Sequence, residues 1–278
     1  MKLKSINWFQ RRLLSSYLRE NELMLGPMLG NLEATKWLYR YSRLRSGRVA
    51  ALTDEDDRVC GVSARFNDGN MMLHAARGED LLAFVPEIKA ARYHTLWLLG
   101  CEEEDARALK EALHLDAHVV RELMMLQKAP VEVPDVGLTF QDISTDPYDP
   151  EYLETVCGML KACFDYRPKE ELMAERMAER TEDEVYLLGS LRGTWVCQAH
   201  IQAWTPNYGH IGGVAVLPEY TGQGLGRSIT ARLCRYIHES GRRPTLTVRE
   251  NNAPAMAVYS ALGFEPVGPV TVLDAYRA

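Results

Sequence analysis

Apolar residues follow a helical spacing in some stretches of the chain and a β-type pattern in others. In the first 130 residues these stretches predict two helices, three strands, a helix, a strand, a helix and a strand. Their approximate ranges are 7–24, 32–43, 48–52, 58–66, 70–76, 80–91, 94–99, 102–113 and 119–127. The alternation of the two periods predicts an α/β (α+β) fold.

A proline-containing stretch without period, 129–134, predicts a linker. We therefore expect two domains, residues 1–130 and 131–278. The second repeats nearly the order of the first: a strand, two helices, three strands, a helix, a strand, a helix and a strand. The ranges are about 138–141, 151–163, 168–180, 185–189, 194–204, 210–217, a helix from 223, then 245–249, 252–262 and 270–273. This order indicates an internal duplication with little residue identity left.

Composition excludes several classes of protein. With 278 residues, 46% hydrophobic and 25% charged, the chain is typical of a soluble globular protein. A net charge of -6 argues against a general nucleic-acid partner, and no stretch is long and apolar enough to predict a membrane span or a signal peptide. The six cysteines form no C-x-x-C pair and have no histidine spacing suited to zinc. We expect no bound metal and a reduced, cytoplasmic location.

The most informative stretch joins an apolar run, Gly212–Leu217, to a bend that contains Gly222, Gly224 and Gly226. A helical pattern follows directly, so the stretch predicts strand, loop and helix. The three glycines let the backbone turn tightly and approach a ligand closely. Several N–H groups can then bind one anion at the positive end of a helix, which predicts a phosphate or pyrophosphate site.

A companion segment lies downstream. Residues 245–248 are β-type, and 252–262 predict a helix with Asn252 as its cap and Pro254 in its first turn. Asn252, Ala255 and Tyr259 are spaced to lie along one face of this helix.

These two segments resemble the acyl-CoA-binding motifs of the GNAT superfamily of N-acyltransferases. The matching residues are V-A-V-L-P-E-Y-T-G-Q-G-L-G at 214–226 and L-T-V-R-E-N-N-A-P-A-M-A-V-Y-S-A-L-G-F at 246–264. The resemblance implies tandem GNAT-like domains, each a mixed, mostly antiparallel sheet flanked by helices. It departs from the family at Thr221, where Arg or Gln is usual, which removes one side-chain contact and leaves the backbone loop intact.

The resemblance also assigns roles. Residues 131–278 become the acyl-CoA-binding catalytic domain, with acetyl-CoA as co-substrate. The pantetheine arm would lie along Val214, Ala215 and Val216, with Asn252 on its other side. The full set implied for acyl-CoA is Val214, Ala215, Val216, Thr221, Gly222, Gln223, Gly224, Leu225, Gly226, Arg227, Ser228, Asn252, Ala255 and Tyr259. Tyr259 is also expected to be the catalytic general acid, because a phenol with a pKa of about 10 can give its proton to a departing thiolate.

The expected reaction is acetyl transfer from acetyl-CoA to a primary amine of a small molecule or amino acid, directly within a ternary complex. The alternatives are a non-catalytic CoA-binding regulatory module, or a transferase that uses a longer acyl-CoA or a protein or peptide amine. The general base stays open between His200, His210 and a water relay. Residues 164–167, with Trp204 and Tyr208, are candidates for contacting the acceptor.

The first half differs where the glycine loop should be. Residues 75–80 contain no Gly-x-Gly and carry Glu79 and Asp80 where an anion would bind. We therefore predict that residues 1–130 form a degenerate GNAT-like domain without CoA. The domain could cover a sheet edge, wall the acceptor site or form a homodimer contact.

Overall fold

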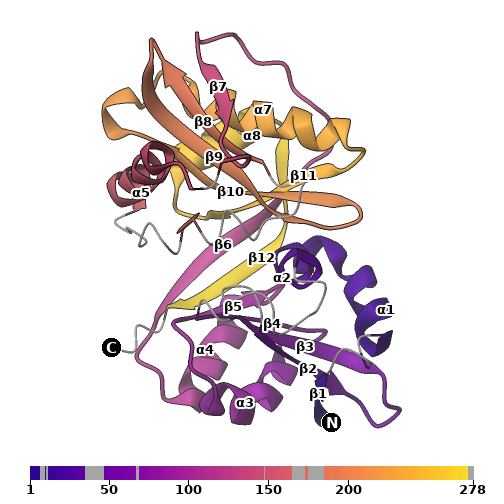
Figure 1. Ribbon diagram of the computed structural model, residues 1–278. Coiled ribbons are helices and arrows are strands. Elements are labelled where there is room, and N and C mark those ends of the chain that lie inside the picture. The colour runs from indigo at the N-terminus through magenta and orange to yellow at the C-terminus, as the bar shows by residue number, and fades with distance from the viewer. Residues whose placement is uncertain are drawn as a thin grey trace. The chain divides into compact units, whose positions relative to one another are not determined.

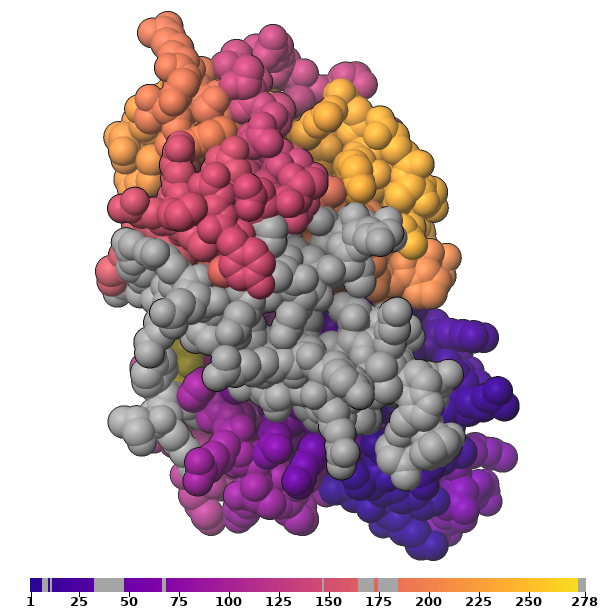
Figure 2. All heavy atoms as spheres, viewed as in Figure 1, coloured from indigo at the N-terminus to yellow at the C-terminus, as the bar shows by residue number. Residues whose placement is uncertain are grey.

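The computed structural model describes residues 1–6, 10, 12–34, 47–66, 69–146, 148–164, 173–174 and 185–274, and the remaining residues are grey in Figures 1 and 2. These residues form two compact units, each built from separate pieces of the chain. Unit 1 comprises Met1–Met124, Thr247–Asn252 and Pro266–Ala278, and unit 2 comprises Met125–Leu246 and Ala253–Glu265. Among the described residues, no helix is long and apolar enough to cross a bilayer.

Unit 1 contains a sheet in the order β1-β2-β3-β4-β5-β12-β6. The strands are β1 (Lys2–Ile6), β2 (Gly47–Thr53), β3 (Val59–Phe66), β4 (Asn70–Ala75), β5 (Thr95–Leu99), β6 (His118–Gln127) and β12 (Phe264–Asp274). The helices are α1 (Arg12–Glu20), α2 (Glu22–Ala34), the 3-10 helix η2 (Gly78–Phe84), α3 (Val85–Ala90) and α4 (Glu103–Leu113). Only β4 and β5 pair in parallel among the registered pairs of this unit; the others are antiparallel.

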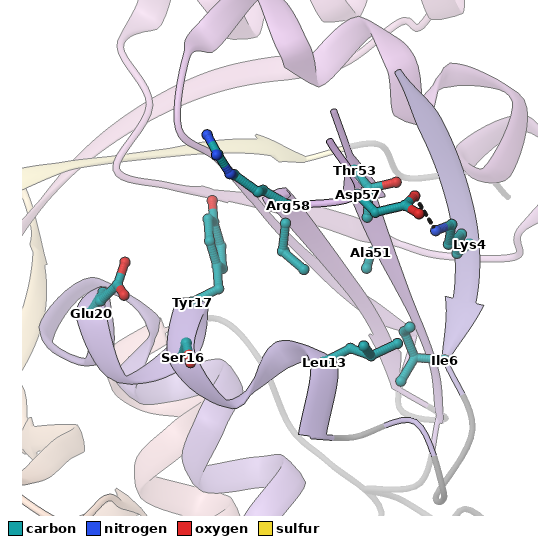
Figure 3. Close-up of a pocket in the computed structure, with 11 residues that line it drawn as sticks. Lys4, Ile6, Leu13, Ser16, Tyr17, Glu20, Ala51, Thr53, Asp57 and Arg58 are labelled. Carbon is teal, nitrogen blue, oxygen red and sulfur yellow. Dashed lines mark hydrogen bonds and ion pairs between the residues drawn. The ribbon is translucent and has the colours of Figure 1, made fainter. Parts of the chain in front are cut away.

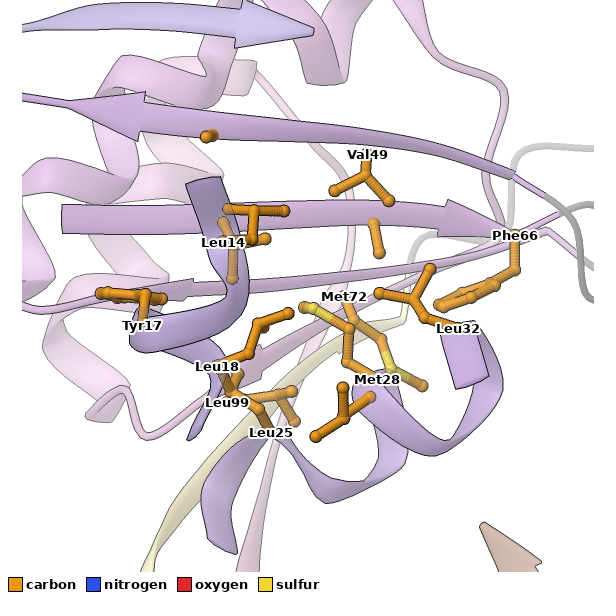
Figure 4. Packing of buried hydrophobic residues seen from close by; sticks show 14 of the residues in the cluster. Leu14, Tyr17, Leu18, Leu25, Met28, Leu32, Val49, Phe66, Met72 and Leu99 are labelled. Carbon is orange, nitrogen blue, oxygen red and sulfur yellow. The ribbon is translucent and has the colours of Figure 1, made fainter. Parts of the chain in front are cut away.

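Helices cover both faces of the unit 1 sheet. On one face, α1 buries Leu14, Tyr17 and Leu18 because these residues recur at helical spacing, and α2 adds Leu25 and Met28 (Figure 4). The other face packs against η2, α3 and α4 in a second apolar cluster. Strands buried on both faces read as nearly continuous apolar runs, which is how β4 and β5 appear in the sequence.

Unit 2 contains the order β11-β10-β9-β8-β7, and the end of β6 also belongs to it. Its strands are β7 (Thr139–Asp142), β8 (Tyr186–Leu191), β9 (Thr194–Trp204), β10 (Tyr208–Val216) and β11 (Arg243–Arg249). Its helices are α5 (Pro150–Phe164), the 3-10 turn η3 (Pro218–Tyr220), α7 (Leu225–Glu239) and α8 (Ala253–Ala261). Helix α5 packs on one face of the sheet through a cluster that includes Val156, Tyr186 and Leu188.

The fold class is as predicted, because both halves have mixed, mostly antiparallel sheets flanked by helices. Three elements differ from the sequence analysis. A strand, β1, precedes the first helix, and α2 begins at Glu22 and spans the gap between the helices predicted at 7–24 and 32–43. The helix predicted at 80–91 is a 3-10 helix followed by a short α-helix. The helix predicted at 168–180 lies almost wholly outside the described residues.

The last strands of the two halves are exchanged. β5 pairs antiparallel with β12, from Thr95–Asp274 to Leu99–Val270, so the final strand of the second half completes the sheet of unit 1 (Figure 1). β6, the final strand of the first half, neighbours β11 instead. The domain boundary at residues 130 and 131 stays a prediction, since neither unit is a continuous stretch of chain.

Candidate functional site

Strand β10 parts from β11 midway along its length and bulges against β9 at the same place. Its parallel pairing with β11 runs from Tyr208–Arg243 to Ile211–Leu246 and is registered no further. Its antiparallel pairing with β9 skips from Gly212–His200 to Ala215–Gln198, so Gly213 and Val214 form a bulge. Gly213 has φ +60°, a conformation that favours glycine. Backbone groups in the second half of β10 are thus free of pairing with β11, although Ala215 and Val216 pair with β9, and the groups without a strand partner can bind a ligand.

The glycine loop follows this bulge and ends in an uncapped helix. Gly222 and Gly224 both have φ +79°, and α7 begins directly after Gly224 without a side-chain cap. The first turn of α7 contains no acidic residue. Gly226 packs against β10, because a Cβ there would lie 3.5 Å from Cγ2 of Val216. A helix N-terminus with free N–H groups and no carboxylate of its own fits an anionic group such as a pyrophosphate.

The structure places the predicted cofactor residues on three consecutive elements. Val214, Ala215 and Val216 form the end of β10, Thr221–Gly224 form the loop, and Leu225–Ser228 form the first turn of α7. Gln223 is exposed, and the Thr221 hydroxyl donates to the Pro218 carbonyl at 2.8 Å. The carbonyl of Val216 accepts a contact from the Cys163 thiol at 3.3 Å.

Tyr259 lies on α8, buried to 8% exposure. Its ring makes an edge contact with Phe264 at 5.9 Å, and it lies near Cys234 of α7. Burial, with a smaller contribution from Cys234, raises the pKa of Tyr259 to about 12. The phenol therefore holds its proton throughout the neutral range. Ala255 lies on the same helix, and Asn252 directly precedes it.

The two candidate histidines have different surroundings. His210 is 3% exposed, shares a 3.1 Å hydrogen bond with Thr245, and has its pKa lowered to about 4 by burial. His200 is half-buried and stacks on Tyr186, with ring centroids 4.8 Å apart. It also lies against the bulge, since a Cβ on Gly213 would sit 2.6 Å from its Nδ1.

The two aromatic residues expected to contact the acceptor lie far along β10 from the glycine loop. Trp204 and Tyr208 flank the turn between β9 and β10, at the opposite end of β10 from the glycine loop. Arg242 covers the Trp204 ring at 4.7 Å, and Arg243 covers the Tyr208 ring at 5.1 Å. Both rings therefore bind arginines of the chain itself. Phe164 ends α5 and is exposed, while 165–167 lie outside the described residues.

Sequence reasoning missed Gln198 on β9. Its side chain is completely buried, and neither Nε2 nor Oε1 has a hydrogen-bond partner among the residues that the structure describes. Gln198, His200 and Gln202 recur at every second position of a predicted buried strand, and this spacing was a signal that could have identified them.

Glu122 on β6 was missed as well. It hydrogen-bonds with Thr247 and lies near Arg249, all within unit 1, yet burial raises its pKa overall. Its carboxyl therefore accepts a proton at higher pH than an exposed glutamate does. β6 is distant in sequence from the glycine loop, so its spacing gives no sign that Glu122 lies beside β11 residues.

Unit 1 contains a pocket of about 520 Å³ between α1 and the strands β1 to β3 (Figure 3). Apolar side chains such as Ile6 and Leu13 line it, and Lys4 and Asp57 at its rim pair at 2.7 Å. It contains none of the residues predicted for acyl-CoA. Among the described residues, no three His, Cys, Asp or Glu side chains group as metal ligands would.

Comparison with solved structures identifies the fold. A tandem GNAT protein from the clavulanic acid biosynthesis pathway superposes with a TM-score of 0.59 at 14% identity, covering 100% of this chain and 99% of that one. A GCN5-related N-acetyltransferase from Sphaerobacter thermophilus gives a TM-score of 0.62 at 15% identity, covering 98% and 94%. Residues 188–270 match a family model described as FR47-like protein. The chain thus has the tandem GNAT fold, which confirms the resemblance found in its motifs.

The relatives found by sequence carry a more specific name than the structural neighbours do. A mycothiol acetyltransferase of Rhodococcus opacus (strain B4) is 32% identical over 185 residues, which are 58% of this chain and 57% of that protein. A mycothiol acetyltransferase of Arthrobacter sp. (strain FB24) is 29% identical over 161 residues, 52% and 50% of the two chains. The chain therefore spans about half the length of these curated relatives.

Proposed function

We propose that the second half of the chain is an acetyl-CoA-dependent N-acetyltransferase that transfers the acetyl group directly to a primary amine in a ternary complex. The observation that carries this proposal is the combination of a parted, bulged β10 with an uncapped α7 N-terminus at its end. A thioester substrate with a pyrophosphate needs both features, because one binds its extended arm and the other its charge.

Each group of residues has a separate task. The N–H groups of Gly224 to Arg227 and of the loop glycines would bind the phosphates, because the Ser228 N–H already donates to the Gly224 carbonyl at 3.0 Å. The backbone of Val214 to Val216, which has no registered pairing with β11, would bind the arm. Acetyl-CoA supplies the activated acyl carbonyl and a thiolate leaving group. Tyr259 would donate its proton to that thiolate, and its raised pKa keeps the proton available until the sulfur atom develops charge.

His200 is the better of the two histidine candidates for receiving the proton of the amine. It lies against the bulge, whereas His210 is sealed in the sheet with its pKa lowered to about 4 and is a poor base at neutral pH. We propose that residues 1–130 do not bind CoA, that the protein acts in the cytoplasm, and that its acceptor is a small-molecule amine. The name of the sequence relatives makes mycothiol-related amines one class to test.

The experiment is a thiol-release assay with acetyl-CoA against amines, amino acids, peptides and mycothiol-related amines, with calorimetric acetyl-CoA binding on the same sample. Acceptor-dependent release is expected. Tight binding without release by any acceptor would favour a regulatory CoA-binding module instead.

His200→Gln and His210→Gln form a matched pair for the same assay between pH 5 and 9. We expect His200→Gln to lower kcat about 100-fold or more and to remove the acidic limb of the pH profile. An equal loss in both variants would remove His200 from the mechanism.

A further inference from the structure

Strand β9 presents a row of neutral polar side chains on one face of a central strand. Gln198 lies opposite Leu188 and Ala215, and His200 lies opposite Tyr186 and Gly212. Leu188 and Tyr186 belong to the apolar cluster under α5, so the row begins where apolar side chains are the rule. Gln202 continues the row at a register shift two residues further along.

The glycines of the β10 bulge make room for this row. A Cβ on Gly212 would lie 2.5 Å from Oε1 of Gln202, and a Cβ on Gly213 would lie 2.6 Å from the His200 ring. Any other residue at these two positions would displace the polar side chains. The row therefore lies beside the bulge that interrupts the pairing of β10 with β9 between Gly212 and Ala215.

Gln198 is the unusual member. Its exposure is 0%, and neither its amide nitrogen nor its amide oxygen has a partner. A buried amide without partners has lost its hydrogen bonds to water and has formed none within the protein. This costs free energy, and folded proteins therefore contain few such groups. Leucine would fill the same space without this loss, so the amide calls for a ligand that supplies the missing bonds.

The chemistry of the surrounding strands limits that ligand. β8, β9 and β10 contain no Asp, Glu, Lys or Arg, so these strands offer no ion pair. A glutamine amide both donates and accepts, and its natural complement is a hydroxyl or another amide.

We propose that Gln198, with His200 and Gln202, forms the acceptor-recognition row of unit 2, and that the acceptor is an amine carrying neutral hydrogen-bonding groups, hydroxyl or amide, close to its nitrogen. A hydrocarbon amine or a polyamine leaves the buried amide unsatisfied and is discriminated against for that reason. This inference rests on the proposed acetyl transfer and adds the class of its acceptor.

The test compares matched acceptors that differ only in these groups: 2-aminocyclohexanol against cyclohexylamine, and glycinamide against propylamine. We expect the wild-type kcat/KM to favour the hydroxyl- and amide-bearing member of each pair by about 100-fold. Gln198→Leu should reduce this ratio at least 10-fold. A ratio near one in the wild type, or an unchanged ratio in the variant, would overturn the proposal.

Gln127 provides a matched control for stability. It is also completely buried, but its Nε2 donates to the Leu262 carbonyl at 2.6 Å and its Oε1 bonds with His238 at 3.0 Å. Gln127→Leu should therefore lower Tm by about 2–4 °C or more, while Gln198→Leu should leave Tm unchanged or raise it. A fall in Tm for Gln198→Leu comparable with that for Gln127→Leu would show that Gln198 has a structural role and would contradict the inference.

Binding without turnover separates this inference from the proposed function. Thermal shifts with the same four amines are measured in the presence of CoA, which needs no transfer. If no amine is acetylated but the hydroxyl and amide members still stabilise the wild type more than Gln198→Leu, only the proposed reaction fails. If amines are acetylated without the discrimination, only the acceptor class fails.

Discussion

The two halves differ at the turn that leads from a strand into a helix, which is α7 in unit 2 and η2 in unit 1. In unit 2 the loop after β10 has two glycines with positive φ and leads into a helix of 15 residues that has no acid in its first turn. In unit 1 the corresponding turn leads into η2, a 3-10 helix of 7 residues with Glu79 and Asp80 in its first turn. Asp80 is 1% exposed and accepts hydrogen bonds from Arg77 at 2.9 and 3.1 Å. The carboxylate of Asp105 lies directly against Gly78.

The residues at the end of the parallel strand pair also differ between the two units. In unit 1, His74 follows the last parallel pair of β4 and β5, Leu73–Leu98. The Tyr17 hydroxyl bonds with His74 Nδ1 at 2.6 Å, and Gly100 packs against the imidazole. Unit 1 thus places its own side chains just past the last parallel pair of its strands. The comparison teaches that a few residues at one helix terminus distinguish the unit proposed to bind an anion from the unit whose own carboxylates lie there.

The largest expected effect comes from replacing one buried tyrosine in each unit, Tyr259 and Tyr17, with phenylalanine. Tyr259→Phe should lower kcat about 10²–10⁴-fold, because the general acid is lost, while acetyl-CoA binding measured by calorimetry persists. Tyr17→Phe should leave turnover intact and lower the free energy of unfolding by about 1–3 kcal/mol, because His74 loses its partner. Equal turnover in the two variants would remove Tyr259 from the mechanism.

Acid should destabilise both halves through one buried histidine each. Burial lowers the pKa values of His74 and His210 from 6.5 to about 4. Between pH 6.5 and pH 4 each of these histidines is protonated in the unfolded chain but stays largely neutral in the folded chain. Each therefore lowers the free energy of unfolding by up to about 3 kcal/mol as the pH falls over this range.

Urea unfolding at pH 7 and pH 4.5 measures this loss. His74→Gln and His210→Gln should each reduce the difference between the two pH values, whereas the exposed His118→Gln should not. A pH dependence that neither buried variant alters would contradict the account.

The smallest expected effect is on acetyl-CoA binding and comes from a change at the proposed anion site of unit 2. Gln223→Glu places a carboxylate in the exposed loop of unit 2 and so imitates the acidic turn of unit 1. Repulsion between unit charges about 4 Å apart amounts to about 1–4 kcal/mol, so the Kd for acetyl-CoA should rise about 10-fold or more and the effect should shrink in high salt.

Gln141→Glu, on exposed β7, changes the net charge equally and serves as the control. Calorimetry should give one acetyl-CoA per chain in the wild type. Two equivalents of acetyl-CoA bound by the wild type would mean that unit 1 also binds the substrate. The same conclusion would follow if a chain that no longer binds acetyl-CoA at the glycine loop still bound one equivalent.

Local patterns in the sequence accounted for much of the structure. The glycine loop and the helix of Tyr259 were predictable because turn and helix signals act over a few residues. The strand exchange was not predictable, because the sequence of an apolar strand such as β12 does not indicate which strand it pairs with. Gln198 escaped notice because the cost of its amide depends on burial and on the register with β8 and β10. The bounds of α2 were predicted wrongly, because burial of the residues around Pro27 outweighs the poor helix propensity of proline.

The exchanged strand also sets an order of events during synthesis. Thr271 of β12 donates to the carbonyl of Cys101 across 170 residues of sequence, and Val270 and Val272 belong to the apolar core that α1 and α2 build. A ribosome adding about 5–20 residues per second releases β12 roughly 10–30 s after β5. Until then β5 has no β12 to pair with, and an unpaired apolar strand edge favours pairing with other chains.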